Sequence, residues 1–359
     1  MLLYMKPKIV ILNIYQLGYH TDTYNYCRYL KSEFDVTYVS FNQGFEEIRI
    51  EGVRTVSIPQ PRGFRNLLKG YVDLARIIKN EKPDLVFIVY VRFISVVRFF
   101  IPNTQFIFDI RTGSLFEKPL KRYFWNLLLR LESTLFRRIT IISEGLREDL
   151  RIAARKCSWL PLGGNRVAGK KDYSSIKLLY LGTLDQRNIY TTIEGFALFK
   201  KEFPGVDITY DIVGYGKDEA EELIRSSISE TGFENSIRFH GRVPYSRVED
   251  FLKGANTGVV FLPVTPYYQH QPTTKLFEFL LAGIPVIATN TEENRSIVTD
   301  INGILIDDTP EGFLNGLKII SKKLGLFNED LIRDSVSSYT WESIVEQHLK
   351  PVLLKAING

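Results

Sequence analysis

Cysteine and long apolar runs are both scarce in this chain. Only Cys27 and Cys157 occur among 359 residues, too few to cross-link a fold of this size, and this scarcity favours the reducing cytoplasm. The longest nearly apolar stretch, residues 85–102, is interrupted by Arg92 and Arg98, which argues against a membrane span. The chain ahead of the first expected strand is too short for the apolar region of a secretion signal. These absences predict a cytoplasmic protein without a transmembrane helix.

The glycine-rich fingerprint of dinucleotide-binding sites is absent as well. Gly18 stands alone after the first expected strand. Residues 213–216, Val-Gly-Tyr-Gly, are followed by charged residues and fail the Gly-x-Gly-x-x-Gly pattern. This counts against an enzyme that uses a nicotinamide or flavin cofactor.

Charge is distributed unevenly along the chain. Residues 1–161 carry 25 Lys and Arg against 15 Asp and Glu, whereas the remaining residues carry 21 against 26. A basic first half suggests that this half faces an anionic partner, for which lipid and nucleic acid are the candidates. Nucleic acid is not expected, because the basic residues belong to no recognisable recognition module.

The order of the expected elements indicates two domains of the same kind. Apolar runs typical of buried parallel strands alternate with helical patterns over residues 8–110 and again over 177–288. Residues 166–175, rich in Gly, Lys and Ser without periodicity, are typical of a linker. The sequence therefore predicts an α/β protein with two Rossmann-like, doubly wound parallel-sheet domains, over residues 1–165 and 176–338.

The stretch 271–288 reads as a loop, a helix and a strand. Thr273 suits the helix start, where free N–H groups and the positive end of the helix dipole attract an anion. Lys275 adds a positive charge there, and Glu278, one turn deeper, could accept hydrogen bonds from the hydroxyls of a ribose. The pattern predicts a nucleotide-sugar site, although Lys and Glu three residues apart also form ordinary surface pairs.

This stretch also resembles a known family. Residues 275–278, Lys-Leu-Phe-Glu, precede Ala-Gly-Ile-Pro-Val-Ile-Ala at 282–288, as in the donor-site segment of family-4 retaining glycosyltransferases. The resemblance implies the GT-B fold, in which two domains face a cleft and a C-terminal helix, here 339–359, crosses back to the first domain. That family usually has two glutamates separated by seven residues; Glu278 matches the second, and His270 stands in place of the first.

The resemblance implies further contacts with the donor. Gly182 and Thr183 follow an expected strand where the family commonly has Gly-Arg, so Arg187 becomes the phosphate cation. Residues 237–243 correspond to the segment whose backbone reads the edge of the base in similar proteins. The implied donor-binding residues are Gly182, Thr183, Gly214, His240, Arg242, Val243, His270, Thr273, Thr274 and Leu276.

Candidate acceptor residues lie at strand ends of the first domain. Ligands of doubly wound sheets bind beyond the carboxyl ends of the strands, where Gly18 permits close backbone approach. His20 either contacts the acceptor or the transferred sugar, or is a solvated loop residue. Asp109 and Arg111 either line the cleft or form a buried ion pair that caps the sheet. The residues assigned to the cleft are Gly18, Asp109, Arg111 and Thr112, and the resemblance adds Ser143 and Glu144, where the family usually has a similar Ser-Glu/Asp pair facing the cleft.

Residues 119–138 have the pattern of a basic amphipathic helix, rich in Leu, Phe and Trp. Such a helix can lie in a membrane interface, or it can pack its apolar face on its own domain. Because similar family members often act on lipid-linked acceptors, we expect a peripheral site on the inner face of the cell membrane.

The chain contains no Asp-x-Asp pair. A divalent metal on the diphosphate is therefore not expected, and fixed cations must stabilise the leaving group. Arg187, Lys275, Glu278 and His20 form the expected catalytic set. The resemblance implies retaining transfer from a nucleoside-diphosphate sugar, with UDP or GDP and no cofactor. The acceptor would be a hydroxyl of a glycan or of a lipid-linked molecule in bacterial cell-surface glycan synthesis.

Two alternative functions remain open at this point. A nucleotide-sugar 2-epimerase has the same two-domain shape and needs no acceptor. A non-catalytic nucleotide-sugar-binding protein is suggested by His270 and Thr183, which depart from the family pattern.

Overall fold

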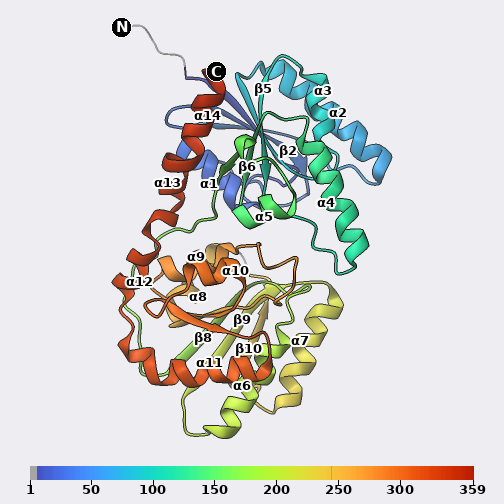
Figure 1. Ribbon diagram of the computed structural model, residues 1–359. Helices are drawn as coiled ribbons and strands as arrows, with labels where there is room; N and C mark the ends of the chain where they lie inside the picture. Colours follow the sequence, from blue (N-terminus) through green and yellow to red (C-terminus); the bar gives the residue numbers. More distant parts are fainter. Residues whose placement is uncertain (1–5, 244) are drawn as a thin grey trace. The chain divides into compact units, whose positions relative to one another are not determined.

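A computed structural model describes residues 6–243 and 245–359, except the side chains of 245 and 246. Residues 1–5, part of the N-terminal stretch judged too short for a secretion signal, lie outside the described residues. The chain forms two compact units (Figure 1). Unit 1 comprises Met1–Leu162 and Trp341–Gly359, and unit 2 comprises Gly163–Thr340.

Unit 1 is built on a seven-stranded parallel sheet in the order β3-β2-β1-β4-β5-β6-β7. The chain moves outward from β1 in one direction and from β4 in the other, so the topology switches between these two strands. The strands are β1 (Lys8–Leu12), β2 (Asp35–Asn42), β3 (Val53–Pro59), β4 (Leu85–Val89), β5 (Gln105–Ile110), β6 (Arg138–Ile141) and β7 (Cys157–Trp159). The helices are α1 (Thr21–Leu30), α2 (Phe64–Glu81), α3 (Val97–Phe100), α4 (Pro119–Ser133) and α5 (Glu144–Asp149).

Unit 2 repeats this plan with six parallel strands in the order β10-β9-β8-β11-β12-β13. Its switch point lies between β8 and β11. The strands are β8 (Ile176–Thr183), β9 (Ile208–Tyr215), β10 (Ile237–Gly241), β11 (Thr257–Val260), β12 (Val286–Thr289) and β13 (Gly303–Ile306). The helices are α6 (Tyr190–Glu202), α7 (Asp218–Thr231), α8 (Tyr245–Gly254), α9 (Thr274–Leu281), α10 (Glu292–Ile297), α11 (Pro310–Lys323) and α12 (Glu329–Ser335). The expected fold class, two doubly wound parallel sheets, is confirmed.

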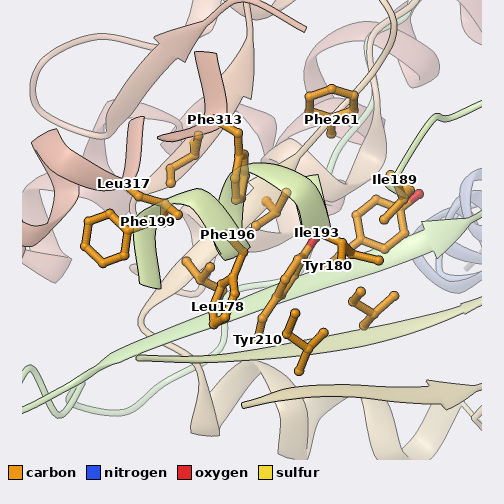
Figure 2. Packing of buried hydrophobic residues seen from close by; sticks show 14 of the residues in the cluster. Leu178, Tyr180, Ile189, Ile193, Phe196, Phe199, Tyr210, Phe261, Phe313 and Leu317 are labelled. Carbon is orange, nitrogen blue, oxygen red and sulfur yellow. The ribbon is translucent and has the colours of Figure 1, made fainter. Parts of the chain in front are cut away.

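The core of unit 2 contains stacked aromatic rings among Ile and Leu side chains. Phe196 of α6 stacks on Tyr210 of β9, which also stacks on Phe313 of α11 (Figure 2). The Tyr210 hydroxyl lies 2.9 Å from Thr192 Oγ1, so its one polar atom is satisfied inside this apolar layer. This packing fixes α6 and α11 against one face of the sheet.

The C-terminal segment belongs to unit 1. It consists of α13 (Trp341–Ile344), a π-helical turn (Val345–Leu349) and α14 (Lys350–Ile357). Trp341 is 1% exposed and packs edge-on against Tyr26, and Leu349 and Leu353 join the same core. The apolar face of this segment therefore completes the core of the first sheet.

Two expected boundaries differ from the observed ones. The helix expected over 119–138 ends at Ser133, because Phe136 turns into the core and stacks on Phe108 at 4.3 Å, and Arg138 begins β6. The stretch expected to be the linker, 166–175, lies in unit 2, where the Val167 N–H donates to the Leu281 carbonyl. Among the described residues, no helix combines the length and apolar character needed to cross a bilayer.

Candidate functional site

The loops that follow β8 and β11 lie at one edge of the second sheet. Parallel strands end at the same edge, and these two strands are neighbours at the switch point, where doubly wound sheets bind their ligands. The loop after β8 carries Arg187, and the loop after β11 leads into α9 with Lys275 and Glu278. Tyr268, in the second loop, connects the two, because its hydroxyl donates to the Gln186 carbonyl at 3.3 Å.

Arg187 is held in a conformation that leaves one nitrogen unused. Its guanidinium lies 4.7 Å from the centre of the Tyr268 ring, a cation–π contact. Gln186 and Asn188 on either side have positive φ angles of 57° and 52°, a left-handed backbone that costs about 1–3 kcal/mol per residue. Arg187 Nη1 is buried and has no hydrogen-bond partner among the described residues. A buried donor of this kind is suited to an anionic ligand.

Helix α9 begins as the sequence predicted. Thr273 is the N-cap, and its hydroxyl accepts from the Lys275 N–H at 3.1 Å. Lys275 Nζ lies 2.6 Å from Glu278 Oε2, and Glu278 is 7% exposed. Glu278 Oε1 is buried without a partner among the described residues, so it remains available to accept a hydrogen bond. Thr274 is the first helical residue, whereas the Leu276 side chain is buried in the core.

Gly214, near the end of β9, is explained by the sheet. A Cβ atom at Gly214 would lie 2.3 Å from the Gly182 carbonyl oxygen, so only glycine fits there. The Tyr180 hydroxyl donates to the Thr183 carbonyl at 2.6 Å, which fixes the end of β8. Gly214 thus permits close strand packing immediately beneath the loop that carries Arg187.

The residues expected to read the base lie on and after the edge strand β10. His240 Nε2 lies 2.6 Å from Asp211 Oδ1, and its ring meets Phe251 edge-on. The guanidinium of Arg242 lies 4.5 Å from the centre of the Tyr215 ring. Val243 follows and is half-buried. Strand β9 separates this group from the strand that precedes Arg187.

His270 is paired with a carboxylate that the sequence analysis missed. His270 Nε2 lies 3.0 Å from Glu292 Oε2 on α10, and the Glu292 N–H donates to Gln269 Oε1. The loop before α9 is therefore tied to the helix that follows β12. The only sequence signal was the Thr-Glu-Glu start of α10, which is typical of an ordinary N-cap. Among the described residues, no group of three or more His, Cys, Asp or Glu is placed to hold a metal ion.

In unit 1, His20 is the N-cap of α1. Its Nδ1 accepts from the Thr23 N–H at 3.5 Å, so in the neutral ring the proton is on Nε2. Burial lowers the pKa of His20; Asp22 opposes this shift and Arg111 adds to it. His20 is therefore a neutral hydrogen-bond donor near pH 7. Gly18 is required close by, because its φ is 92° and a Cβ atom would lie 2.3 Å from Ile48 Cδ1.

Asp109 and Arg111 form a buried ion-pair cluster with Asp22. Arg111 Nη2 lies 2.7 Å from Asp22 Oδ2, and Arg111 Nη1 lies 3.6 Å from Asp109 Oδ1. Asp109 has no exposed surface and also accepts from the Thr140 hydroxyl at 2.7 Å. Burial raises the pKa of Asp109 to about 6, against the lowering effect of Arg111. Of the two readings left open by the sequence, the structure favours the ion pair that caps the sheet.

The remaining acceptor-side residues lie at the ends of β5 and β6. The Thr112 hydroxyl donates to the Gly113 carbonyl at 3.0 Å. Ser143 is the N-cap of α5 and accepts from the Leu146 N–H at 3.2 Å. Glu144 is exposed and paired with Arg147 at 2.7 Å.

Comparison with known families matches both halves of the chain. The family described as "Glycosyltransferase Family 4" matches residues 18–159, and that described as "Glycosyl transferases group 1" matches residues 175–322. Together the two matches span most of the chain. No curated protein matches it by sequence.

Solved structures show the same fold over the whole length. The chain is similar to a sucrose-phosphate synthase from Thermosynechococcus elongatus, with a TM-score of 0.75 and 15% identity over 98% of this chain and 99% of that one. It is similar to HepE from Anabaena in complex with UDP and glucose, with a TM-score of 0.74 and 14% identity over 97% and 100%. The lipopolysaccharide outer core galactosyltransferase WaaB gives a TM-score of 0.69 and 14% identity over 97% and 99%. The two family matches agree with the two doubly wound sheets of the structure. The chain belongs to the family-4 glycosyltransferases with the GT-B fold.

Proposed function

We propose that this glycosyltransferase moves a sugar from a nucleoside-diphosphate sugar to a hydroxyl of a glycan or lipid-linked acceptor, with retention at the anomeric carbon. Unit 2 binds the donor and unit 1 the acceptor. The observation that carries the proposal is the pair of unsatisfied buried atoms at the β8/β11 switch point, Arg187 Nη1 and Glu278 Oε1. A phosphate oxygen would accept a hydrogen bond from Arg187 Nη1, and a ribose hydroxyl would donate one to Glu278 Oε1. The complex of HepE with UDP and glucose supports UDP as the nucleotide, with GDP as the alternative.

In this mechanism, fixed positive charges supply most of the stabilisation of the transition state. Arg187, Lys275 and the first N–H groups of α9 stabilise the diphosphate as the bond to the sugar breaks. The acceptor hydroxyl attacks the anomeric carbon from the face on which the diphosphate leaves. The departing phosphate oxygen takes the proton of that hydroxyl. His20 donates from Nε2 to a hydroxyl of the acceptor or of the transferred sugar, for which its neutral state is suited.

A thermal-shift panel of nucleoside diphosphates and their sugars tests the donor site. A ligand at about a hundred times its Kd stabilises a protein by about 2.7 kcal/mol, or about 5–10 °C for a unit of this size. We expect UDP or GDP to give such a shift, and the shift to persist in EDTA because Arg187 and Lys275 replace a metal. No shift with any nucleotide at millimolar concentration would contradict the proposal.

The same panel, followed by product analysis, separates the two alternatives. Conversion of the donor into its epimer without any acceptor would indicate a 2-epimerase. Tight nucleotide binding without transfer to any acceptor would indicate a binding protein, as the departures at His270 and Thr183 suggest.

We further propose that α4 contacts an anionic membrane surface, which would place the protein at the inner face of the cell membrane in cell-surface glycan assembly. Leu120, Tyr123 and Phe124 are 86%, 64% and 58% exposed. The one acidic residue of the helix, Glu132, is buried and accepts from the N–H groups of Phe93 and Ser95. The exposed charges of α4, Lys121 and Arg130, are therefore both positive, and the half-buried Arg122 is positive as well. Aromatic and cationic side chains on one exposed helix suit the headgroup region of anionic lipids.

Vesicle sedimentation tests this contact. We expect binding to phosphatidylglycerol-containing vesicles but not to phosphatidylcholine vesicles, and weaker binding at high salt. The double substitution Leu120→Ser and Phe124→Ser removes two apolar anchors and should weaken binding about tenfold or more. Leu326→Ser, at an 81% exposed leucine of unit 2, is the matched control. Equal binding by the double variant and the control would rule out the α4 surface.

A further inference from the structure

The two points where the chain passes between the units are joined to each other. The chain enters unit 2 at Gly163 and leaves it after Thr340. Just inside unit 2, the Gly164 N–H donates to the Tyr339 carbonyl at 3.0 Å, and Gly164 forms a parallel bridge with Thr340. We name residues 163–164 and 339–340 the crossing pair.

The crossing pair lies directly against the backbone of α9. A Cβ atom at Gly164 would lie 3.1 Å from Glu278 N, 3.2 Å from Glu278 Cα and 3.1 Å from Leu281 Cδ1. The first two are main-chain atoms of a helix, which cannot turn aside as a flexible side chain can. Any residue larger than glycine at 164 must therefore shift α9 by a few tenths of an ångström, at the residue that we assign to the ribose.

The second segment of the crossing pair, residues 339–340, packs on the same helix. The Tyr339 ring stacks on Phe277 with ring centres 4.5 Å apart and an angle of 22°. Phe277 is 2% exposed and precedes Glu278 in α9. Gly164 and Tyr339 thus contact successive residues of the turn that carries Lys275 and Glu278.

The chain next to the crossing pair is also anchored in unit 1. Arg111 Nη1 donates to the Leu160 carbonyl at 2.8 Å, just before the first crossing. Trp341, just after the second crossing, is buried against Tyr26. Only a few residues along the chain therefore separate these unit 1 anchors from the crossing pair.

We propose that Gly164 and Tyr339 are positioning residues for the donor, which set the place of Glu278 and Lys275 without touching the ligand. This rests on the proposed function, because it concerns the same α9 site. Binding of a nucleoside diphosphate then favours one arrangement of the crossing pair, and by linkage the crossing pair sets the affinity for the nucleotide. A misplacement of about 1 Å can cost about a hundredfold, so we expect a shift of a few tenths of an ångström to weaken recognition several-fold to about tenfold.

The test is the affinity for UDP, or for GDP if the panel above prefers it, measured by calorimetry. We expect Gly164→Ala to raise the Kd several-fold to about tenfold. The matched control is Gly205→Ala in the same unit, where an added Cβ meets nothing within 4 Å and the Kd should not change. Tyr339→Ala should also raise the Kd, and Tyr339→Phe, which keeps the stacked ring, should restore it.

Two readouts distinguish positioning from a structural role. A purely structural residue would lower the melting temperature of the free protein and leave the nucleotide Kd unchanged. If Gly164 acts through Glu278, Gly164→Ala should have little further effect in a Glu278→Gln background. Should Gly164→Ala fail to fold, the two Tyr339 variants provide the same test.

Failure of this inference can be distinguished from failure of the proposed function. If the wild type binds UDP or GDP but Gly164→Ala and Tyr339→Ala bind it within twofold of the wild type, this inference is wrong and the proposed function stands. If the wild type binds no nucleoside diphosphate, the donor site fails and this inference fails with it.

Discussion

Arg187→Ala is expected to lower the turnover number about a hundredfold or more. Loss of one preorganised donor that stabilises charge in the transition state has an effect of this size. Arg187 fits that role because its guanidinium is fixed on the Tyr268 ring while Nη1 stays buried and unsatisfied. Its flanking residues hold strained backbone angles, which is common where a side chain must be aimed at a ligand. Steady-state kinetics with the preferred donor measure the effect.

The controls for this experiment come from the same unit. Arg225 on α7 also makes a cation–π contact at 4.7 Å, with Phe239, but lies outside the proposed site. Arg225→Ala should therefore keep turnover near that of the wild type. Lys275→Ala should resemble Arg187→Ala. Turnover of Arg187→Lys should fall between that of Arg187→Ala and that of the wild type, because lysine keeps the charge but loses the fork of donors. Wild-type turnover in both alanine variants would refute the assignment.

Arg111→Met is expected to lower the free energy of unfolding of unit 1 by about 3–5 kcal/mol, the usual cost of removing one partner of a buried ion pair. The change leaves Asp22 and Asp109 without their cation in a site where Asp109 has no exposed surface. It also removes the hydrogen bond to the Leu160 carbonyl. Because all three tryptophans lie in unit 1, urea unfolding followed by tryptophan fluorescence reports on that unit alone.

The pH dependence of this loss gives a second check. Burial raises the pKa of Asp109 to about 6, whereas Arg111 lowers it. Without Arg111 the carboxyl takes up a proton more readily, so the unpaired charge can be neutralised at mildly acidic pH. The decrease in the free energy of unfolding caused by Arg111→Met should therefore be smaller at pH 5 than at pH 8. Arg76→Met, which breaks the exposed pair with Asp73, should change stability by less than about 1 kcal/mol. A similarly small change for Arg111→Met would show that the cluster is not stabilising.

The local features that sequence reasoning recovered depend on neighbouring residues. The run at 85–89 is apolar throughout and forms β4, a strand buried on both faces. Thr273 caps α9, and Lys275 meets Glu278 three residues later, because the geometry of one helical turn dictates both contacts. The helix over 119–138 was predicted too long, since its end depends on Phe136 reaching Phe108 on another strand.

By itself, the sequence determined the two doubly wound sheets, the α9 start with its Lys and Glu, and the family resemblance, since strand and helix periodicity and capping act within a few residues. Only the tertiary structure decided that Arg111 pairs with Asp22, that His270 pairs with Glu292, and that Gly164 lies on the backbone of Glu278. These contacts join residues brought together by strand order and helix packing. Charge and spacing along the chain do not encode which buried partners will meet, because that depends on how the sheets and helices assemble.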